Sequence, residues 1–317
     1  MQAPVRRLSS VRPVLCLLAA CLLLTPVGCG SSAKHSTRAT RGAFAYDAAQ
    51  PLRYADRGRV NKAYPIAIHD VSYTAGHDRI DGYLALPPSS GKRLPAVLYL
   101  HGSGGDRKQL VVPATWLAAR HAIGLVITAP SATTPSTTGG SVLARLRREA
   151  RLEERDVIAV RRGIDLLRRR PDVDASRIGF VGWSAGARTG AILAGVEPRF
   201  RAVVLMSGGA SPISSYAARA PASLRPAIRR YLGTVDPLRY VRRASSSRLF
   251  LQDGRRDQVV PRSALAALAR AASTGTTVRW YDADHGLNAR AYRDQLTWLA
   301  QKLRLVLPPV RGALTGP

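Results

Sequence analysis

The chain has 317 residues, a length that fits one large α/β domain together with a targeting segment. Hydrophobic residues make up 46 % of it, far more than a disordered chain would contain, so a globular core is expected. The formal net charge is +28, from 48 Lys and Arg against 20 Asp and Glu. These basic residues are scattered and are not interleaved with aromatic residues, which argues against a specific nucleic-acid site.

The N-terminal segment has the pattern of an export signal. Arg6, Arg7 and Arg12 form a positively charged stretch without acidic residues, and an apolar run over 14–24 follows. That run is too short to span a membrane comfortably but has the length of a signal-peptide core. We therefore predict a signal peptide over residues 1–28.

The end of this segment resembles a bacterial lipobox, because the small residue Gly28 precedes Cys29 after the apolar run. The resemblance implies that Cys29 becomes the lipidated first residue of the mature chain, on the outer face of the bacterial cytoplasmic membrane. Pro26 departs from the pattern, which usually has an aliphatic residue three positions before the cysteine. Plain secretion after cleavage near Gly28 or Gly30, and an uncleaved anchor, therefore remain as alternatives.

The cysteines all belong to this segment, at positions 16, 21 and 29. The folded domain is thus expected to contain no disulfide, thiolate metal site or cysteine nucleophile. Without the first 28 residues, which carry three Arg and no acid, the net charge is about +25. We attribute this charge mainly to an Arg-rich composition, with anionic lipid headgroups or acidic envelope polymers as alternative partners.

Four segments are predicted along the chain: the signal peptide (1–28), a flexible Ser/Thr/Arg-rich tether (29–62), a folded domain (63–306) and a C-terminal tail (307–317). The densest basic run, 145–170, also contains Glu149, Glu153, Glu154, Asp156 and Asp165. Such mixing predicts a solvated helix face.

The folded domain alternates strand and helix patterns. Strands are predicted at 66–73, 79–86, 95–100, 122–127, 177–181, 201–206, 248–251 and 278–281, the first as an antiparallel edge strand. Helices are predicted at 112–121, 142–167, 185–195 and 289–303. This alternation indicates an α/β fold with a doubly wound, mostly parallel sheet, whose ligands bind at the carboxyl ends of the strands.

The most informative motif is Gly182-Trp183-Ser184-Ala185-Gly186, between a buried strand and a helix. This is the context of a nucleophile elbow, in which a strained turn exposes the serine hydroxyl above the sheet. A Cβ at Gly182 or Gly186 would crowd the neighbouring strand and helix. The N–H of Ala185, at the positive end of the helix, can face a developing oxyanion.

From about Pro65 to Leu303 the chain resembles the α/β-hydrolases, most closely the dienelactone-hydrolase-like and related esterase branch. The resemblance rests on an HG-type loop at 101–102, the elbow, an acid after a late strand, and a C-terminal histidine, in the family's order. It implies a serine hydrolase with a Ser-His-Asp triad.

His285 is the only histidine after Ser184, so the resemblance implies that it is the base. For the acid, the resemblance indicates Asp257, three residues after Gly254. Asp253, also at the strand end, is the alternative, although an Asp ahead of Gly also forms turns. The acids beside His285, Asp282 and Asp284, are expected to be loop residues.

In the HG-type loop, the resemblance implies that Ser103 supplies the second oxyanion-hole N–H, beside that of Ala185. His101 is expected to pack beneath this loop. For Trp183, both a pocket-lining and a core position remain open.

The implied reaction is acyl transfer from a small-molecule or polymer ester through an acyl-enzyme, with no metal or organic cofactor. A peptidase or thioesterase on the same triad is one alternative. A prolyl-peptidase-like enzyme is less favoured, because there is no room for a propeller domain. A non-catalytic envelope protein that binds ligands is the other alternative. The segment 208–241 is a candidate lid, and the sequence predicts no oligomeric state.

Overall fold

The computed structural model describes residues 42–61, 65–135 and 140–305, all within one compact unit of the chain, residues 39–317. The predicted signal peptide, Cys29 and the tail over 307–317 lie outside the described residues and stay predictions. No helix in the described ranges is both long enough and apolar enough to cross a membrane.

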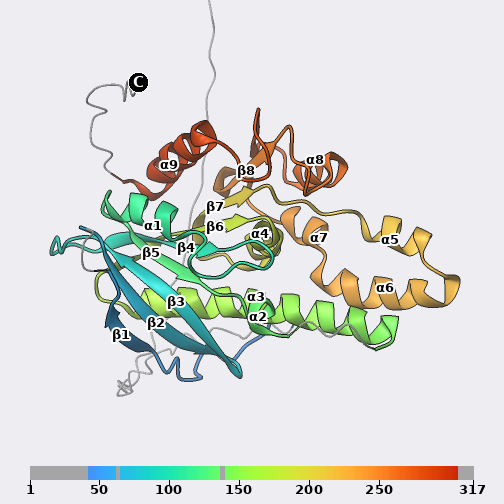
Figure 1. The fold of residues 1–317 in the computed structure, drawn as a ribbon, viewed down its shortest axis with the longest axis horizontal. Coiled ribbons are helices and arrows are strands. Elements are labelled where there is room, and N and C mark those ends of the chain that lie inside the picture. Colours follow the sequence, from blue (N-terminus) through green and yellow to red (C-terminus); the bar gives the residue numbers. More distant parts are fainter. Residues whose placement is uncertain (1–41, 62–64, 136–139, 306–317) are drawn as a thin grey trace, which may run out of the picture. The chain divides into compact units, whose positions relative to one another are not determined.

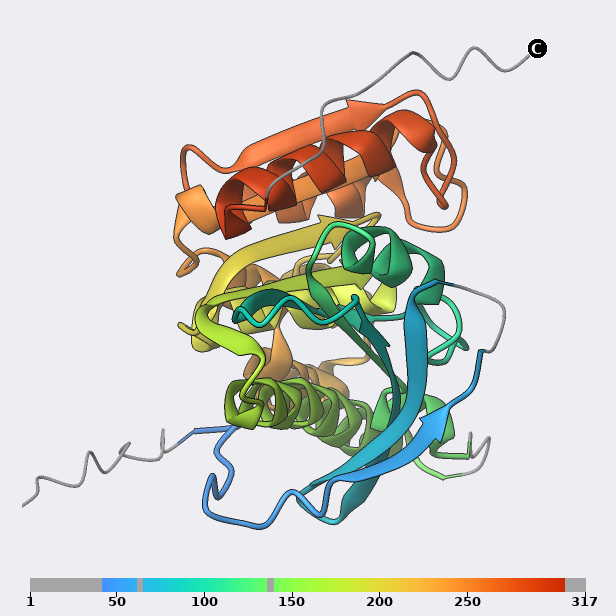
Figure 2. The same ribbon diagram turned by 90° about the vertical axis from the view of Figure 1, so that its left-hand side faces the viewer.

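The core of the domain is a nine-stranded sheet in the order β1-β2-β3-β5-β4-β6-β7-β8-β9 (Figures 1 and 2). The strands are β1 (Ala55–Arg59), β2 (Ala67–Ala75), β3 (Asp78–Leu86), β4 (Leu94–Leu100), β5 (Ile123–Ile127), β6 (Val173–Trp183), β7 (Phe200–Met206), β8 (Leu249–Gly254) and β9 (Thr277–Tyr281). From β5 to β9 every pairing is parallel, whereas β1, β2 and β3 are antiparallel. The predicted mostly parallel α/β sheet is confirmed.

Helices cover both faces of the sheet, as in a doubly wound fold. They are α1 (Val111–Ala118), α2 (Pro130–Thr133), α3 (Val142–Arg169), α4 (Ala185–Val196), α5 (Ile213–Arg219), α6 (Arg225–Leu232), α7 (Pro237–Val241), α8 (Arg262–Ala271) and α9 (Ala289–Leu303). One apolar core lies between the sheet and α3, α4 and α8, and a second lies beneath α1 and α9 (Figure 1). Because both faces are covered, strands such as β4 and β5 are apolar along almost their whole length.

The segment before residue 62 differs from the predicted tether, since its described part, 42–61, packs against the domain. Strand β1 pairs with β2, so the edge strand is β1 and not the predicted 66–73. Phe44 and Leu52 are buried in the core. Fully buried Arg162 of α3 donates hydrogen bonds to the carbonyl oxygens of Ala48 and Gln50. The composition suggested a tether because its few apolar anchors lie far apart in a polar stretch.

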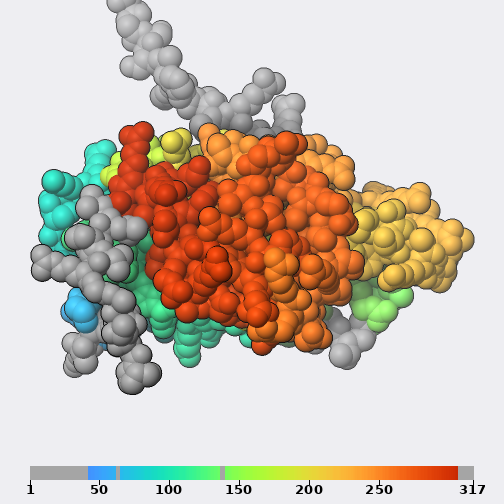
Figure 3. Space-filling view, turned by 90° about the horizontal axis from the view of Figure 1, so that it is seen from above, coloured from blue at the N-terminus to red at the C-terminus, as the bar shows by residue number. Residues whose placement is uncertain are grey.

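The chain between β7 and β8 forms the short helices α5, α6 and α7. Helix α6 packs on α3, and Figure 1 shows these helices extending from one end of the sheet. In the view from above, the same segment (yellow) lies beside the C-terminal third of the domain (orange to red) (Figure 3). Helix α8, which was not predicted, covers the sheet between β8 and β9.

Candidate active site

Ser184 lies in the tight turn between β6 and α4, with φ 56° and ψ −112°. A non-glycine residue adopts this conformation only when its surroundings enforce it. Here the Ser184 N–H donates to the carbonyl oxygen of Met206 on β7, at 2.8 Å. The turn thus holds the serine at the carboxyl end of the central strands, as the elbow motif predicts.

The two glycines of the motif are required by close backbone contacts. A Cβ added to Gly182 would lie 2.3 Å from the carbonyl oxygen of Gly186. A Cβ added to Gly186 would lie 2.3 Å from the carbonyl oxygen of Leu100 and 2.6 Å from that of His101. Any larger residue would therefore push α4 away from β4 and β6.

His285 and Asp257 come together on the loops that follow β9 and β8. The Nδ1 atom of His285 lies 2.8 Å from Oδ2 of Asp257, whose side chain is 1 % exposed. The other carboxylate oxygen of Asp257 accepts hydrogen bonds from the N–H groups of Val259 and Val260, at 2.8 and 2.9 Å. These bonds fix the carboxylate so that it can orient the imidazole.

The backbone of His285 is fixed against the elbow. Its carbonyl oxygen accepts hydrogen bonds from the indole Nε1 of Trp183, at 3.0 Å, and from the hydroxyl of Ser207, at 2.8 Å. The ring of Trp183 also packs on the imidazole, with 5.1 Å between ring centroids. Trp183, the residue before the nucleophile candidate, therefore contacts the base candidate directly. The sequence did not reveal this contact.

The hydroxyl of Ser184 forms no hydrogen bond with any other described residue, His285 included. Hydrogen bonds of this kind are often long in a ligand-free enzyme and tighten when substrate binds. What the structure brings together is the Asp257–His285 pair and, through Trp183, the elbow.

Asp253, the alternative acid, is placed differently. It is 1 % exposed, and its Oδ2 has no hydrogen-bond partner among the described residues. Burial, reinforced by the charge of Asp257, raises the pKa of Asp253 to about 7. It forms no hydrogen bond with His285. Asp282 and Asp284, as expected, are exposed loop residues that pair with Arg256.

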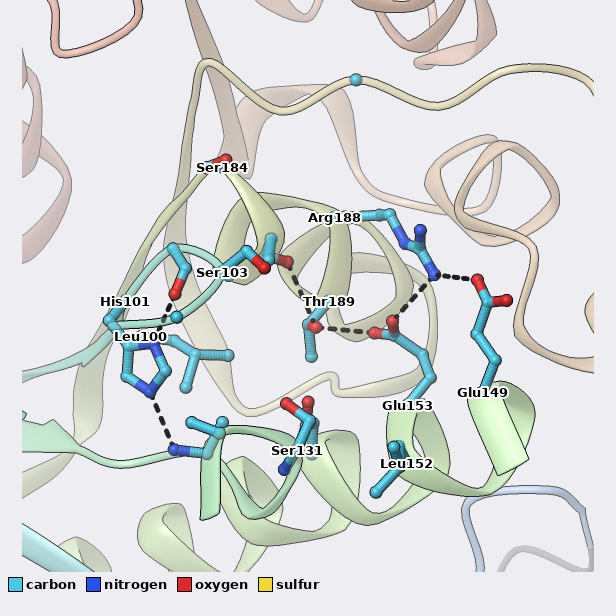
Figure 4. Close-up of a pocket in the computed structure, with 18 of the residues that line it drawn as sticks. Leu100, His101, Ser103, Ser131, Glu149, Leu152, Glu153, Ser184, Arg188 and Thr189 are labelled. Carbon is cyan, nitrogen blue, oxygen red and sulfur yellow. Dashed lines mark hydrogen bonds and ion pairs between the residues drawn. The ribbon is translucent and has the colours of Figure 1, made fainter. Parts of the chain in front are cut away.

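The loop after β4 carries Ser103, which the sequence indicates as the candidate for the second oxyanion donor. Ser103 is exposed, and its N–H donates to no other described residue. His101 is 4 % exposed and supports this loop, because its ring bonds to Gly102 O at 2.7 Å and accepts from Ala129 N–H at 3.0 Å (Figure 4). Burial lowers the pKa of His101, in keeping with a neutral structural role.

A cavity of about 440 Å³ adjoins Ser184. Both oxyanion-donor candidates, Ser103 and Ala185, contribute to its lining. On its far side, α3, α4 and the segment around Ser131 contribute polar side chains alongside apolar ones such as Leu152 (Figure 4).

Several acidic residues of α3 are more buried than the predicted solvated helix face implies, so that prediction is wrong for them. Glu153, Asp156 and Asp165 are 8, 6 and 8 % exposed, and the first two line the cavity together with Glu149. Spacings of four and three residues put 149, 153 and 156 on one helix face, a signal present in the sequence. Periodicity alone did not tell a cavity-facing side from a solvent-facing one.

This geometry and fold define a class: a serine hydrolase on the α/β-hydrolase fold. The sequence of residues 147–305 matches the model of the prolyl oligopeptidase family. The chain belongs to that family. No curated protein matches the chain in sequence.

Solved structures share the fold at low sequence identity. An acetyl xylan esterase from Paenibacillus sp. R4 is 21 % identical, with a TM-score of 0.67 over 80 % of this chain and 89 % of that one. Acetyl xylan esterase 1 from Thermoanaerobacterium sp. JW/SL YS485 is 17 % identical, with a TM-score of 0.64 over 79 % and 88 %. An S-formylglutathione hydrolase from Agrobacterium tumefaciens is 18 % identical, with a TM-score of 0.58 over 78 % and 99 %. The dienelactone-hydrolase-like branch stays a prediction.

Proposed function

We propose that this chain hydrolyses carboxylic esters through an acyl-enzyme on Ser184, with His285 as general base and Asp257 as the carboxylate that orients it. The observation that carries the proposal is the 2.8 Å contact between His285 Nδ1 and Asp257, held beside the strained turn of Ser184. A serine hydroxyl is a weak nucleophile at neutral pH and needs such a base.

In the first step, Nε2 of His285 takes the Ser184 proton as Oγ bonds to the ester carbonyl carbon. The tetrahedral intermediate collapses, the bond to the alkoxy oxygen breaks, and the imidazolium returns the proton to the leaving alcohol. In the second step, water gives a proton to His285 and attacks the acyl-enzyme, which releases the acid and restores the Ser184 hydroxyl. Asp257 stabilises the imidazolium in both steps.

The N–H groups of Ser103 and Ala185 are the proposed oxyanion donors. Ala185 is the first residue of α4, and the first N–H groups of a helix have no partner inside it. Donors fixed before the reaction stabilise the developing charge without reorganisation. This chemistry requires no metal or organic cofactor.

Esters are the proposed substrates because the similar solved structures include two acetyl xylan esterases. Small-molecule and polymer esters both fit an exposed Ser103 loop. The predicted signal segment supports a place of action outside the cytoplasm, with lipid anchoring through Cys29. Because the chain matches the prolyl oligopeptidase family, a peptide amide must be tested beside the esters.

The test is hydrolysis of p-nitrophenyl acetate, butanoate and octanoate by the mature chain, beside Ser184→Ala and a matched peptide p-nitroanilide. Ester turnover that Ser184→Ala abolishes supports the proposal. Cleavage of the anilide with inert esters would replace it with a peptidase. If a folded wild-type protein turns over neither, the proposed activity is wrong.

A further inference from the structure

The cavity beside Ser184 reverses the charge balance of the chain. The whole sequence has 48 Lys and Arg against 20 Asp and Glu. Among the described residues that line the cavity, the charged ones are Glu149, Glu153, Asp156 and a single base, Arg188. Three acids face one guanidinium at the point where substrate must bind.

Arg188 does not neutralise this set. Its guanidinium lies 3.3 Å from a carboxylate oxygen of Glu153 and 3.6 Å from one of Glu149, so it is shared between two carboxylates (Figure 4). The hydroxyl of Thr189 donates a further hydrogen bond to Glu153, at 2.6 Å. Because Arg188 is already engaged, the cavity offers little to an anionic ligand.

Asp156 is the acid without a cationic partner in this cavity. It is 6 % exposed, and one of its oxygens accepts a hydrogen bond of 2.9 Å from the N–H of Ser131. Burial, and secondarily the charge of Glu153, raise the pKa of Asp156 to about 7. A cation that enters beside a buried carboxyl of this kind stabilises its ionised form strongly.

The position of the cavity indicates which part of the substrate it receives. Its lining includes Ser184 and both proposed oxyanion donors, Ser103 and Ala185, whereas His285 is not among the described residues that line it. The leaving alcohol must lie near His285, since it takes its proton from there. The acyl group is therefore the part that points into the acidic cavity.

We propose that this cavity selects acyl groups that carry a protonated amine, which Asp156, Glu149 and Glu153 hold by charge. This specificity rests on the proposed ester hydrolysis and names its substrate class. Selection follows from differential binding: an ammonium group meets more carboxylates than Arg188 can pair, whereas an apolar group of the same size leaves buried Asp156 without a cationic partner.

The test compares two p-nitrophenyl esters of equal size, 3-aminopropanoate and butanoate, which differ by an ammonium in place of a methyl group. After correction for buffer hydrolysis, we expect kcat/KM to favour the amino ester. Asp156→Asn keeps the acceptor for Ser131 and should lower the ratio of the two kcat/KM values about tenfold. The ratio of the two kcat/KM values is measured in each variant and compared with the same ratio in wild type. This comparison cancels the difference in intrinsic reactivity between the two esters.

Two further variants make the result specific. Glu149→Gln, at a side chain that is 52 % exposed, should lower the same ratio even if Asp156→Asn folds poorly. Glu154→Gln changes the same charge on the same helix outside the cavity lining and should leave the ratio unchanged. Butanoate hydrolysis with a ratio that neither Asp156→Asn nor Glu149→Gln alters overturns the selectivity and leaves the esterase proposal standing. If neither ester is hydrolysed, the esterase proposal itself fails.

Discussion

The indole nitrogen of Trp183 donates a hydrogen bond of 3.0 Å to the carbonyl oxygen of His285. It connects the residue before Ser184 to the loop that holds the proposed base, 102 positions later in the chain. The tilted contact between the two rings, with 5.1 Å between their centroids, adds a second constraint on the imidazole. The position of the proposed base thus depends on Trp183, which has no proton-transfer role in the proposed reaction.

Trp183→Phe tests this dependence. The variant keeps an aromatic ring against His285 but loses the hydrogen bond, so the imidazole should be less well oriented. We expect kcat for p-nitrophenyl butanoate to fall about tenfold with KM nearly unchanged, because orientation acts on the transition state. A change in KM alone, at constant kcat, would show that Trp183 acts on binding instead.

The two candidate acids can be separated by isosteric variants. Asp257→Asn should lower kcat roughly 10³- to 10⁴-fold, because the amide cannot hold the productive tautomer or stabilise the imidazolium. Asp253→Asn should retain activity within about threefold, since Asp253 forms no hydrogen bond with His285. Steady-state kinetics of both variants decide the assignment, and the opposite pattern would make Asp253 the acid.

The raised pKa of Asp253 predicts a stability effect with a definite sign. In the unfolded chain this carboxyl ionises near pH 3.8, whereas in the folded protein it keeps its proton to about pH 7. The unfolded state therefore binds fewer protons between these values, and the free energy of unfolding falls as pH rises through this window. Asp253→Asn removes the penalty.

Urea unfolding of wild type and Asp253→Asn at pH 5 and pH 8 measures this effect. The gain of the variant over wild type should be larger at pH 8 by on the order of 2–3 kcal/mol. An equal difference at both pH values would mean that Asp253 ionises normally in the folded state.

Replacing a glycine of the elbow should cause a clash with the backbone of a neighbouring strand. Gly186→Ala puts a methyl group 2.3 Å from the carbonyl oxygen of Leu100, a backbone atom that cannot rotate away. We expect a loss of about 3 kcal/mol or more in the free energy of unfolding, together with loss of activity. Gly233→Ala is the matched control, because its Cβ would meet nothing within 4 Å and its φ is −65°. A Gly186→Ala protein as stable as this control would contradict the structure of the elbow.

The sequence predicted the parts of the site that follow from chain order. The elbow was visible because Ser184 stands between a buried strand and a helix, and His285 because no other histidine follows it. Asp257 and Asp253 could not be separated with certainty from the strand end alone. Their difference is a matter of burial and of which loop reaches His285, and only the packed structure shows both.

Other features depended on contacts between distant segments. Residues 42–61 are predicted to be part of a tether because the contacts that fix them come from residues far along the chain, Arg162 among them. The cavity acids on α3 were read as a solvated face because a charged helix side gives the same spacing whether it meets water or a cavity. The sequence around Trp183 and the sequence around His285 contain no pattern that predicts their contact.

The proposed function depends above all on Ser184 being a nucleophile that His285 activates. Its most direct test is intact-protein mass spectrometry after reaction with a fluorophosphonate, on wild type, Ser184→Ala and His285→Ala. We expect one adduct on wild type, mapped to Ser184, and none on Ser184→Ala. Labelling of His285→Ala should be slower by roughly 10³-fold or more. A folded wild-type protein that stays unlabelled, or an adduct that persists in Ser184→Ala, would contradict it.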